Sequence, residues 1–346
     1  MPSAAKLLKA FKKAAHIILG QVLIIKHVTI RRMDNLRRIE IYRGGSRIWG
    51  CERAYANSHP QIRDFTTGIP KDPDFVGFRW LGVGGVELSA GGQVLAIDPF
   101  FTRPRFSAMW GKRVSPNRNL VAARLPRCDF VLVTHAHYDH LMDVPEILRS
   151  SGATAYGSSN TCQILSAAGI PAGQIHEIGP GSQLELGVFK IEAGKGYHGR
   201  TPLDAIINRP LSRRLKPPLR LWDYRMDTCL SFHIQVNGLR IQHGEQPNLA
   251  EVLLINPNQA PEHYQALVQR VQPRLVVPIH WDDFFSPLSR PLRPMFAPPR
   301  WRWPPIRKID LALFKRQVEE SVPQARVLVP EIFRTYDLVK VDTNRP

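Results

Sequence analysis

The segment VLVTHAHYDHLMD, residues 131–143, places metal-binding side chains directly behind an apolar run. The run is typical of a buried strand, so the side chains that follow it lie where a sheet ends and the chain turns. His135 and His137 are two positions apart on an extended chain and therefore face the same way. Imidazoles joined by a carboxylate are typical ligands of Zn, Fe, Mn, Ni or Cu. The segment predicts a metal site, and Asp139 and His140, which follow around the turn, can serve a second ion.

Other residues that could bind metals carry no such prediction. Asp143, at the end of the segment, is interpreted as a residue that starts a helix. Single histidines such as His16, His59 and His176 are interpreted as residues that pack or form hydrogen bonds. The four cysteines are far apart and form no CxxC pair, so neither a thiolate zinc site nor a disulfide framework is predicted. A reducing, cytoplasmic setting fits this use of cysteine best.

The composition favours a globular protein with a basic end. The chain has 346 residues, 43% hydrophobic and 22% charged, enough for one large domain with an appendage or for two ordinary domains. Its net charge is +18, and residues 1–72 hold fourteen Lys and Arg against five Asp and Glu. Such a balance favours phosphate-bearing partners: a membrane surface, a nucleic acid or a small anionic substrate. The charge by itself does not choose among them.

An apolar segment with lysines in front of it, AAHIILGQVLII, occupies residues 14–25. It is shorter than the ~20 apolar residues that a membrane-spanning helix needs, so no transmembrane helix is predicted. Its spacing predicts an amphipathic helix with a lysine-rich face, and the apolar stripe consists of Leu7, Phe11, Ala14, Ile18, Val22 and Ile25. Two interpretations stay open: a helix docked on its own domain, or peripheral contact of residues 1–30 with the inner face of the membrane.

The remaining chain reads as one mixed α/β domain, which we place at residues 73–346 behind a lead-in at residues 1–72. Short apolar runs bounded by Gly, Asp or Pro predict strands, whereas VPEILRSSGA, TCQILSAAGI and PEHYQALVQRVQP have helical spacing. LSFHIQVNGLRIQHG predicts a hairpin that turns at Asn237-Gly238. Two stretches rich in Pro, Arg and bulky apolar residues, 200–225 and 286–308, interrupt the pattern.

THAHYDH resembles the HxHxDH motif of the metallo-β-lactamase fold superfamily, and its surroundings agree with that resemblance. RWLGVGGVEL and VLAIDPFF look like the opening strands of the fold, and GYHG and VVPIHWDDF stand where the family has its other histidines. The resemblance covers roughly residues 75–335 and implies a four-layer αββα sandwich. WLG, IDPFF and PIHW are most similar to the branch with N-acyl-phosphatidylethanolamine phospholipase D and the ascorbate-6-phosphate lactonases.

The resemblance also implies a binuclear site. Two divalent ions are expected, most simply zinc, with manganese or iron as alternatives. The first ion would be held by His135, His137 and His198, and the second by Asp139, His140 and His280. Asp98 is expected to support the site without touching a metal.

The bridging carboxylate of the family is the least regular part of the match. The family has an Asp in a Gly-Asp-Thr turn, and the corresponding segment here is IQHGEQP, in which Gly244 fits but Glu245 and Gln246 do not. Glu245 is the expected bridging ligand, although its side chain is one methylene longer. The site could be a two-metal site with a Glu bridge, a one-metal site, or a site with a weak second metal. His243 is the alternative ligand, or else a core residue.

The expected activity is a metal-dependent hydrolysis in which a metal-bound hydroxide, oriented by Asp139, attacks an anionic ester. The stretches 200–225 and 286–308 follow His198 and His280, so we expect them at the mouth of the site. Their Arg and Trp suit a phospholipid-like phosphodiester, and a lactone is the other substrate considered. Two alternatives stay open: a nuclease of the same fold, and a non-catalytic binding protein with an incomplete metal site. The oligomeric state is not predicted.

Overall fold

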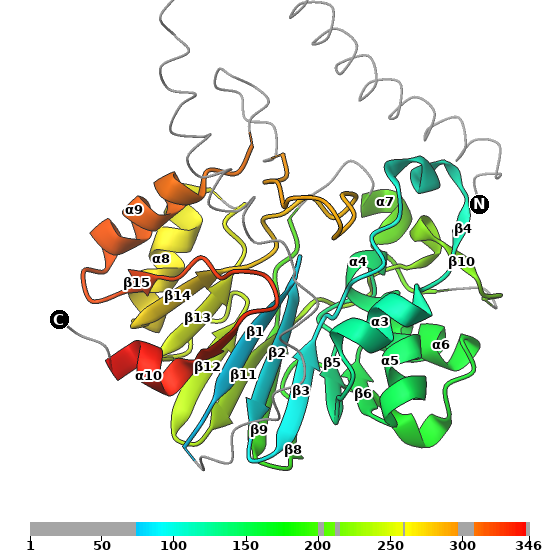
Figure 1. Cartoon of the computed structure of the whole chain (residues 1–346), viewed down its shortest axis with the longest axis horizontal. Coiled ribbons are helices and arrows are strands. Elements are labelled where there is room, and N and C mark those ends of the chain that lie inside the picture. The colour runs from blue at the N-terminus through cyan, green and yellow to red at the C-terminus, as the bar shows by residue number, and fades with distance from the viewer. Residues whose placement is uncertain (1–73, 200–203, 212–214, 259, 297–307, 344–346) are drawn as a thin grey trace, which may run out of the picture. The chain divides into compact units, whose positions relative to one another are not determined.

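The histidine segment lies at the end of a central strand of one of two packed sheets (Figure 1). The computed structural model describes residues 74–199, 204–211, 215–258, 260–296 and 308–343. All of them belong to one compact unit of the chain, which spans residues 54–346. The predicted amphipathic segment, the lead-in at 1–72 and its boundary lie outside the described residues and stay predictions.

The first sheet carries the strand that precedes the histidines. Its strand order is β16-β1-β2-β3-β5-β6-β7, in which β1, β2 and β3 are antiparallel and β3, β5, β6 and β7 are parallel. RWLGVGGVEL and VLAIDPFF, expected as the opening strands, and the apolar run before the histidines all contribute strands to this sheet. Its strands are β1 (Gly77–Gly82), β2 (Gly85–Ala90), β3 (Gln93–Ile97), β5 (Phe130–Leu132), β6 (Thr154–Gly157), β7 (Ile175–Glu177) and β16 (Thr335–Asp337).

The second sheet has the order β15-β14-β13-β12-β11-β9-β8. The predicted hairpin is confirmed: β11 and β12 pair across Asn237 and Gly238, whose φ angles of 48° and 76° suit a type I′ turn. Its strands are β8 (Gln183–Leu186), β9 (Phe189–Lys195), β11 (Leu230–Val236), β12 (Leu239–His243), β13 (Val252–Ile255), β14 (Leu275–Pro278) and β15 (Arg326–Val327). A two-stranded ribbon, β4 (Arg113–Val114) with β10 (Leu219–Arg220), stands apart from both sheets.

Helices cover the outer faces of both sheets, which completes the expected four-layer αββα arrangement (Figure 1). Helices α5 and α6 lie beside β6 and β7, whereas α8 and α9 pack on β13 and β14 through a separate apolar cluster. The helices are α3 (Arg118–Arg124), α4 (Tyr138–Leu141), α5 (Val144–Ser151), α6 (Ser159–Ala167), α7 (Asp204–Ile207), α8 (Pro261–Val271), α9 (Leu311–Ser321) and α10 (Leu338–Thr343), with the 3-10 turns η3 (Phe106–Trp110), η4 (Ala172–Gln174) and η5 (Leu221–Asp223). Among the residues that the structure describes, none of the helices has the length and apolar character of a membrane-spanning segment.

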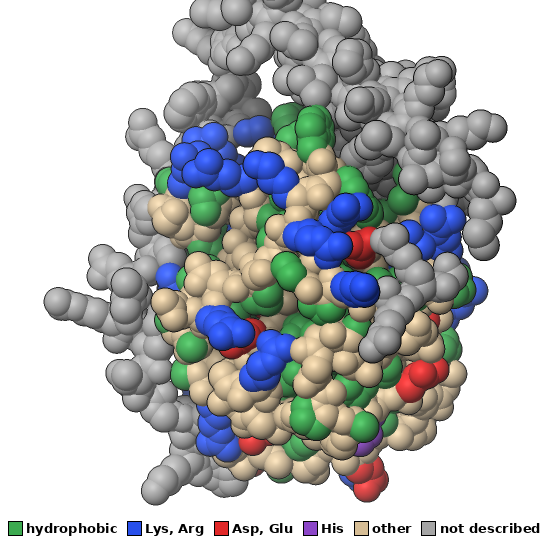
Figure 2. Space-filling view, turned by 90° about the vertical axis from the view of Figure 1, so that its right-hand side faces the viewer, with side chains coloured by type: hydrophobic (Ala, Val, Ile, Leu, Met, Phe, Trp, Pro, Cys, Tyr) green, Lys and Arg blue, Asp and Glu red, His purple; other side chains and the backbone are tan. Residues whose placement is uncertain are grey.

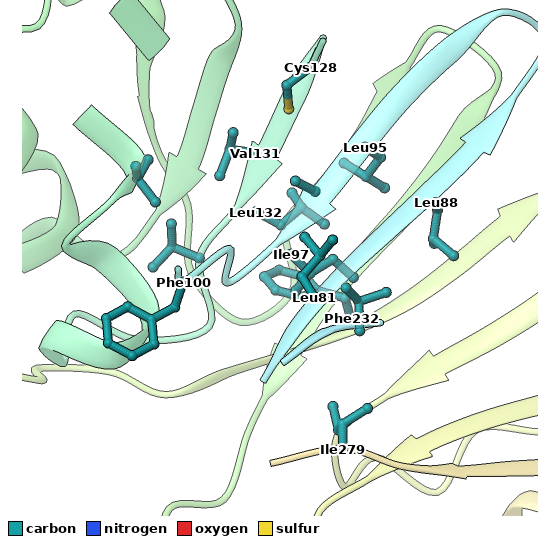
Figure 3. Close-up of a cluster of buried hydrophobic side chains, with 14 of the residues drawn as sticks. Leu81, Leu88, Leu95, Ile97, Phe100, Cys128, Val131, Leu132, Phe232 and Ile279 are labelled. Carbon is teal, nitrogen blue, oxygen red and sulfur yellow. The ribbon is translucent and has the colours of Figure 1, made fainter. Parts of the chain in front are cut away.

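The two sheets are joined by side chains that alternate inward from both. Leu81, Leu88 and Ile97 of the first sheet meet Phe232 and Ile279 from the second sheet and its β14 end (Figure 3). These side chains are almost fully buried. Burying a large apolar side chain stabilises the fold by about 1.5–3 kcal/mol. This shared core holds the ends of the two sheets beside each other.

A buried ion pair fastens three loops at the end of the sandwich where the histidines lie. Arg103 donates to the carboxylate of Asp282 over 2.6 Å, and both side chains are fully buried. The other oxygen of Asp282 accepts from the backbone N–H of Val83. Trp281, next to Asp282, stacks on Trp80 of β1 with ring centroids 5.1 Å apart. The loops that follow β1, β3 and β14 are therefore held together.

Replacing Asp282 with Ala should destabilise the fold by about 3–5 kcal/mol, because Arg103 would remain buried without its counter-charge. Urea denaturation followed by fluorescence would measure the change. Glu331→Ala is the matched control: it removes a carboxylate from a largely exposed pair with Arg334 and should cost no more than about 1 kcal/mol. Equal effects of the two substitutions would show that the buried pair has no special structural role.

Candidate metal centre

Six side chains that could hold metal ions come from three segments and meet at one end of the sandwich. His135 follows β5, His137 is the residue before α4, and Asp139 and His140 lie within α4. The other two side chains come from the second sheet: His198 follows β9 and His280 follows β14. The donor atoms form two groups, each with atoms within 4.8 Å of one another: His135, His137 and His198, and then Asp139, His140 and His280. These are the two sets that the resemblance implies.

The second triad has donor spacings that suit a tetrahedral ion. Nε2 of His280 lies 3.3 Å from Nε2 of His140 and 3.3 Å from Oδ2 of Asp139. Oδ2 of Asp139 lies 3.5 Å from Nε2 of His140. Ligands placed tetrahedrally at about 2.0–2.2 Å from zinc are roughly 3.3–3.6 Å from one another. The three donors fit one zinc-sized ion.

The first triad consists of three imidazoles that face one another. The ring centroids of His135, His137 and His198 are 4.6–5.0 Å apart, and each pair of rings is steeply inclined. Nε2 of His135 is buried and has no hydrogen-bond partner within the described residues. A buried imidazole nitrogen without a partner is costly unless something binds it. A metal ion would satisfy this donor set.

The two triads are adjacent, and burial keeps the first one neutral. The ring centroids of His135 and His140, one from each triad, are 3.9 Å apart. Burial lowers the pKa of His135 well below its usual range and the pKa of His137 to about 4. Neutral imidazoles have the free lone pair that a metal needs. The first triad is therefore arranged for ligation near neutral pH.

Asp98 supports His140 from behind, as expected. Nδ1–H of His140 donates to Oδ2 of Asp98 over 2.7 Å, which leaves Nε2 facing the second triad. Oδ1 of Asp98 accepts from the backbone N–H of Thr134 over 2.8 Å. Burial by itself would lower the pKa of His140, but Asp98 and Asp139 offset it and raise that pKa to about 10. A carboxylate behind a ligating histidine fixes its tautomer and ring orientation.

Asn208 plays the corresponding part for His137. Its Oδ1 lies 3.0 Å from Nε2 of His137. Because a carbonyl oxygen only accepts, this contact places the proton on Nε2 and leaves Nδ1 free toward the triad. Asn208 follows α7 in the stretch 200–225, so this stretch reaches the site as expected. A lone Asn in a stretch rich in Pro and Arg offers no sequence signal for this role.

Gly84, in the turn between β1 and β2, lies against the second triad. A Cβ atom on Gly84 would be 3.2 Å from Cε1 of His140 and 3.5 Å from Cδ2 of His280. His280 has a φ of 59°, and its N–H donates to the carbonyl of Val83 over 2.6 Å. His280 therefore adopts a left-handed backbone conformation, which is uncommon for residues other than glycine. The hydrogen bond to Val83 helps to hold it there.

Asp143 does more than start a helix. It precedes α5, but its side chain makes no capping bond to that helix. Its Oδ2 accepts from the backbone N–H groups of Phe101 (2.6 Å) and Thr102 (2.8 Å). Asp143 thus stands at the start of a helix, as predicted. Its side chain has a second role, because it ties the loop after Asp98 to the histidine segment.

Glu245, the expected bridging ligand, is not in either triad. Its Oε2 lies 2.5 Å from Nε2 of His263 on α8, and the ring of His263 lies beside Tyr197, the neighbour of His198. Burial raises the pKa of Glu245, and the His263 contact partly offsets that rise. His243 is buried at 5% exposure, and neither ring nitrogen has a partner among the described residues. The bridging role of Glu245 stays a prediction.

Comparison with known proteins agrees with this geometry. Residues 94–244 match the Beta-lactamase superfamily domain. A UPF0173 metal-dependent hydrolase of Symbiobacterium thermophilum is 25% identical over 60% of this chain and 84% of its own length. A protein of the same name from Methanopyrus kandleri is 24% identical over 75% of this chain and 98% of its own length. The residues that match the family model contain five of the six donors, all except His280.

Solved structures show the same fold. Igni18, a metallo hydrolase of Ignicoccus hospitalis, has a TM-score of 0.50 and 21% identity over 75% of this chain and 97% of its own. CmlA, a diiron β-hydroxylase of Streptomyces venezuelae, has a TM-score of 0.51 and 14% identity over 77% of this chain and 54% of its own. Because the second protein is a hydroxylase, the fold alone does not determine the reaction.

Removing one histidine from each triad should weaken the binding of one ion at a time. His198→Ala should lower the content of the first ion, and His280→Ala that of the second, by weakening affinity about tenfold or more. Metal analysis after dialysis against a series of buffered zinc concentrations would measure both affinities. His176→Ala is the matched control, because His176 stacks on Tyr156 outside both triads. Unchanged zinc affinity in both ligand variants would contradict the assignment.

Gly84→Ala should weaken the second site selectively. The added methyl group would press on His140 and His280, so zinc affinity should fall at that site and stay unchanged at the first. Cobalt substitution would report the change as an altered visible absorption spectrum. Gly173→Ala serves as control, since a Cβ atom there meets nothing within 4 Å. A wild-type spectrum for Gly84→Ala would show that the turn does not position these ligands.

Proposed function

We propose that this chain, a metal-dependent hydrolase of the metallo-β-lactamase superfamily, cleaves an anionic ester at two divalent ions held by the two triads. The observation that carries the proposal is the adjacency of two three-donor groups, one of them with spacings suited to tetrahedral ligation. When bound, two neighbouring ions would lower the pKa of a water toward about 7 and would polarise the bond under attack. Zinc is the expected metal, with manganese or iron as alternatives.

The protein side chains supply orientation. Asp139, which faces His140 and His280, is placed to accept a hydrogen bond from the attacking water and to aim it at the ester. Asp98 keeps the proton of His140 on Nδ1, and Asn208 keeps that of His137 on Nε2. These contacts fix the ring orientation of both ligands.

The proposed substrate is a phospholipid-like phosphodiester, with a lactone as the second choice. The net charge of +18 favours an anionic substrate. Arg290 and Arg293, which follow His280 in the chain, are exposed and can meet a phosphate. The similarity of WLG, IDPFF and PIHW to the N-acyl-phosphatidylethanolamine phospholipase D and ascorbate-6-phosphate lactonase branch supports both substrate classes.

One observation favours a second candidate, a binding protein without turnover. The carboxylate of Glu245 pairs with His263 and is absent from both triads. If Glu245 stayed with His263 after metal addition, the second ion would have three protein donors and would bind more weakly. Glu245→Ala separates these cases, because it lowers second-site zinc affinity only if the carboxylate reaches the metals.

The zinc- or manganese-loaded chain should hydrolyse bis(p-nitrophenyl) phosphate. Asp139→Ala should lower kcat/KM by a factor on the order of 10² or more, because the attacking water loses its orienting carboxylate. Release of p-nitrophenol would be followed by absorbance, with His176→Ala as control and a γ-lactone assayed in parallel. Two bound ions per chain with no turnover of either substrate would favour the binding protein instead.

A further inference from the structure

An aromatic surface lies at the 3-10 turn η3, away from the donor atoms. Phe106 and Trp110 are 47% and 52% exposed and contact each other edge to face at 5.5 Å. Phe106 also meets Phe285 at 5.1 Å with perpendicular rings. Large apolar side chains gathered on a surface mark a place where an apolar partner binds.

The aromatic surface continues inward to the second triad. Phe285 contacts Phe284 at 4.8 Å, and Phe284 contacts the ring of His280 at 6.2 Å. Tyr138, between the ligands His137 and Asp139, lies 6.1 Å from Phe284. An unbroken chain of ring contacts therefore connects the surface at η3 with a residue of the metal centre.

Positive charges flank the exposed rings. Arg105 precedes η3 and Lys112 follows it; both are exposed, and neither makes an ion pair with a residue that the structure describes. Arg113 donates to the carbonyls of Lys216 and Pro218, which are uncharged groups, so its charge is not neutralised by those contacts. On the side of the molecule shown in Figure 2, Lys and Arg side chains spread over the upper half with apolar side chains among them.

The turn is supported from below. Gly111 ends η3 with a φ of 95°, and a Cβ atom there would collide with the ring of Trp222 at 2.8 Å. Arg113 and Val114 of β4 pair with β10. Trp222 and β10 thus pack against the end of η3, whereas Phe106 and Trp110 are exposed to solvent.

We propose that the η3 surface, formed by Phe106, Trp110, Phe285, Arg105 and Lys112, docks the protein on an anionic lipid surface. Phe and Trp insert at the acyl boundary while Lys and Arg meet the phosphates. The proposal deepens the proposed function: lipid is the source of the ester, and an acyl chain following the rings toward His280 brings its phosphodiester to the metals.

A nucleic acid suits the η3 surface less well. Bases bind by stacking on free ring faces. The rings of Phe106, Trp110 and Phe285 meet at interplanar angles of 60° and 89°, so they do not offer parallel faces on which successive bases could stack. An insertion into a lipid interface needs no free ring face.

The test is co-sedimentation of the full-length, zinc-loaded chain with vesicles of phosphatidylcholine, with and without phosphatidylglycerol. The wild type should bind the anionic vesicles more strongly. The double variant Phe106→Ala and Trp110→Ala should lower the partition coefficient about tenfold or more, and Lys112→Glu about fivefold or more. Leu249→Ala is the matched control, because Leu249 is 56% exposed but lies apart from η3, beside Arg240 and Arg274.

Hydrogen–deuterium exchange gives a local readout. Anionic vesicles should protect residues 105–114 in the wild type. Vesicle binding that is unchanged in the double variant, or protection confined to other segments, would overturn the proposal. Binding of single-stranded RNA that the double variant loses, without vesicle binding, would also overturn it and favour a nucleic acid. Turnover of the soluble diester by the wild type tests the proposed function separately, since that assay contains no lipid.

Discussion

The metal centre depends on bringing donors from both halves of the chain to one end of a two-sheet core. Four donors follow β5 of the first sheet, whereas His198 and His280 come from the second. Burying five imidazoles and a carboxylate is unfavourable unless their polar atoms find partners. The apolar packing between the sheets supplies the driving force that holds this polar cluster together.

Residues outside the triads provide hydrogen-bond partners for the buried ligands. Asp98 holds His140, Asn208 holds His137, and the backbone at Val83 holds His280. The buried Arg103–Asp282 pair and Asp143 then fasten the loops that carry these partners. The ligands are thus positioned by contacts that span the whole end of the sandwich, which pre-organises the site before any ion binds.

The surroundings of the triads bear on substrate choice more than the triads themselves. The same fold serves several reactions, so specificity has to come from the surroundings of the donors. Two features of the rim differ in character: the Glu245–His263 pair beside Tyr197, and the aromatic route from His280 to η3. In the proposed function, the first would affect how firmly a second ion is held, and the second how an amphiphilic ester would reach the ions.

The sequence by itself determined most strands of the first sheet, the Asn237-Gly238 hairpin and the helices α5, α6 and α8, because periodicity and turn chemistry are local signals. The spacing of His135, His137, Asp139 and His140 likewise predicted a metal site, whereas His198 and His280 were expected only from the family resemblance. The two-sheet sandwich and the grouping of donors into two triads followed from the family resemblance, and the tertiary structure agrees with both. Only the tertiary structure showed the support of His137 by Asn208, the second role of Asp143, the approach of Gly84 and the pairing of Glu245 with His263. These contacts join residues that are far apart in the chain, so no local pattern records them. The exposure of Phe106 and Trp110 at η3 was also visible only in the tertiary structure, because exposure depends on how the whole chain folds.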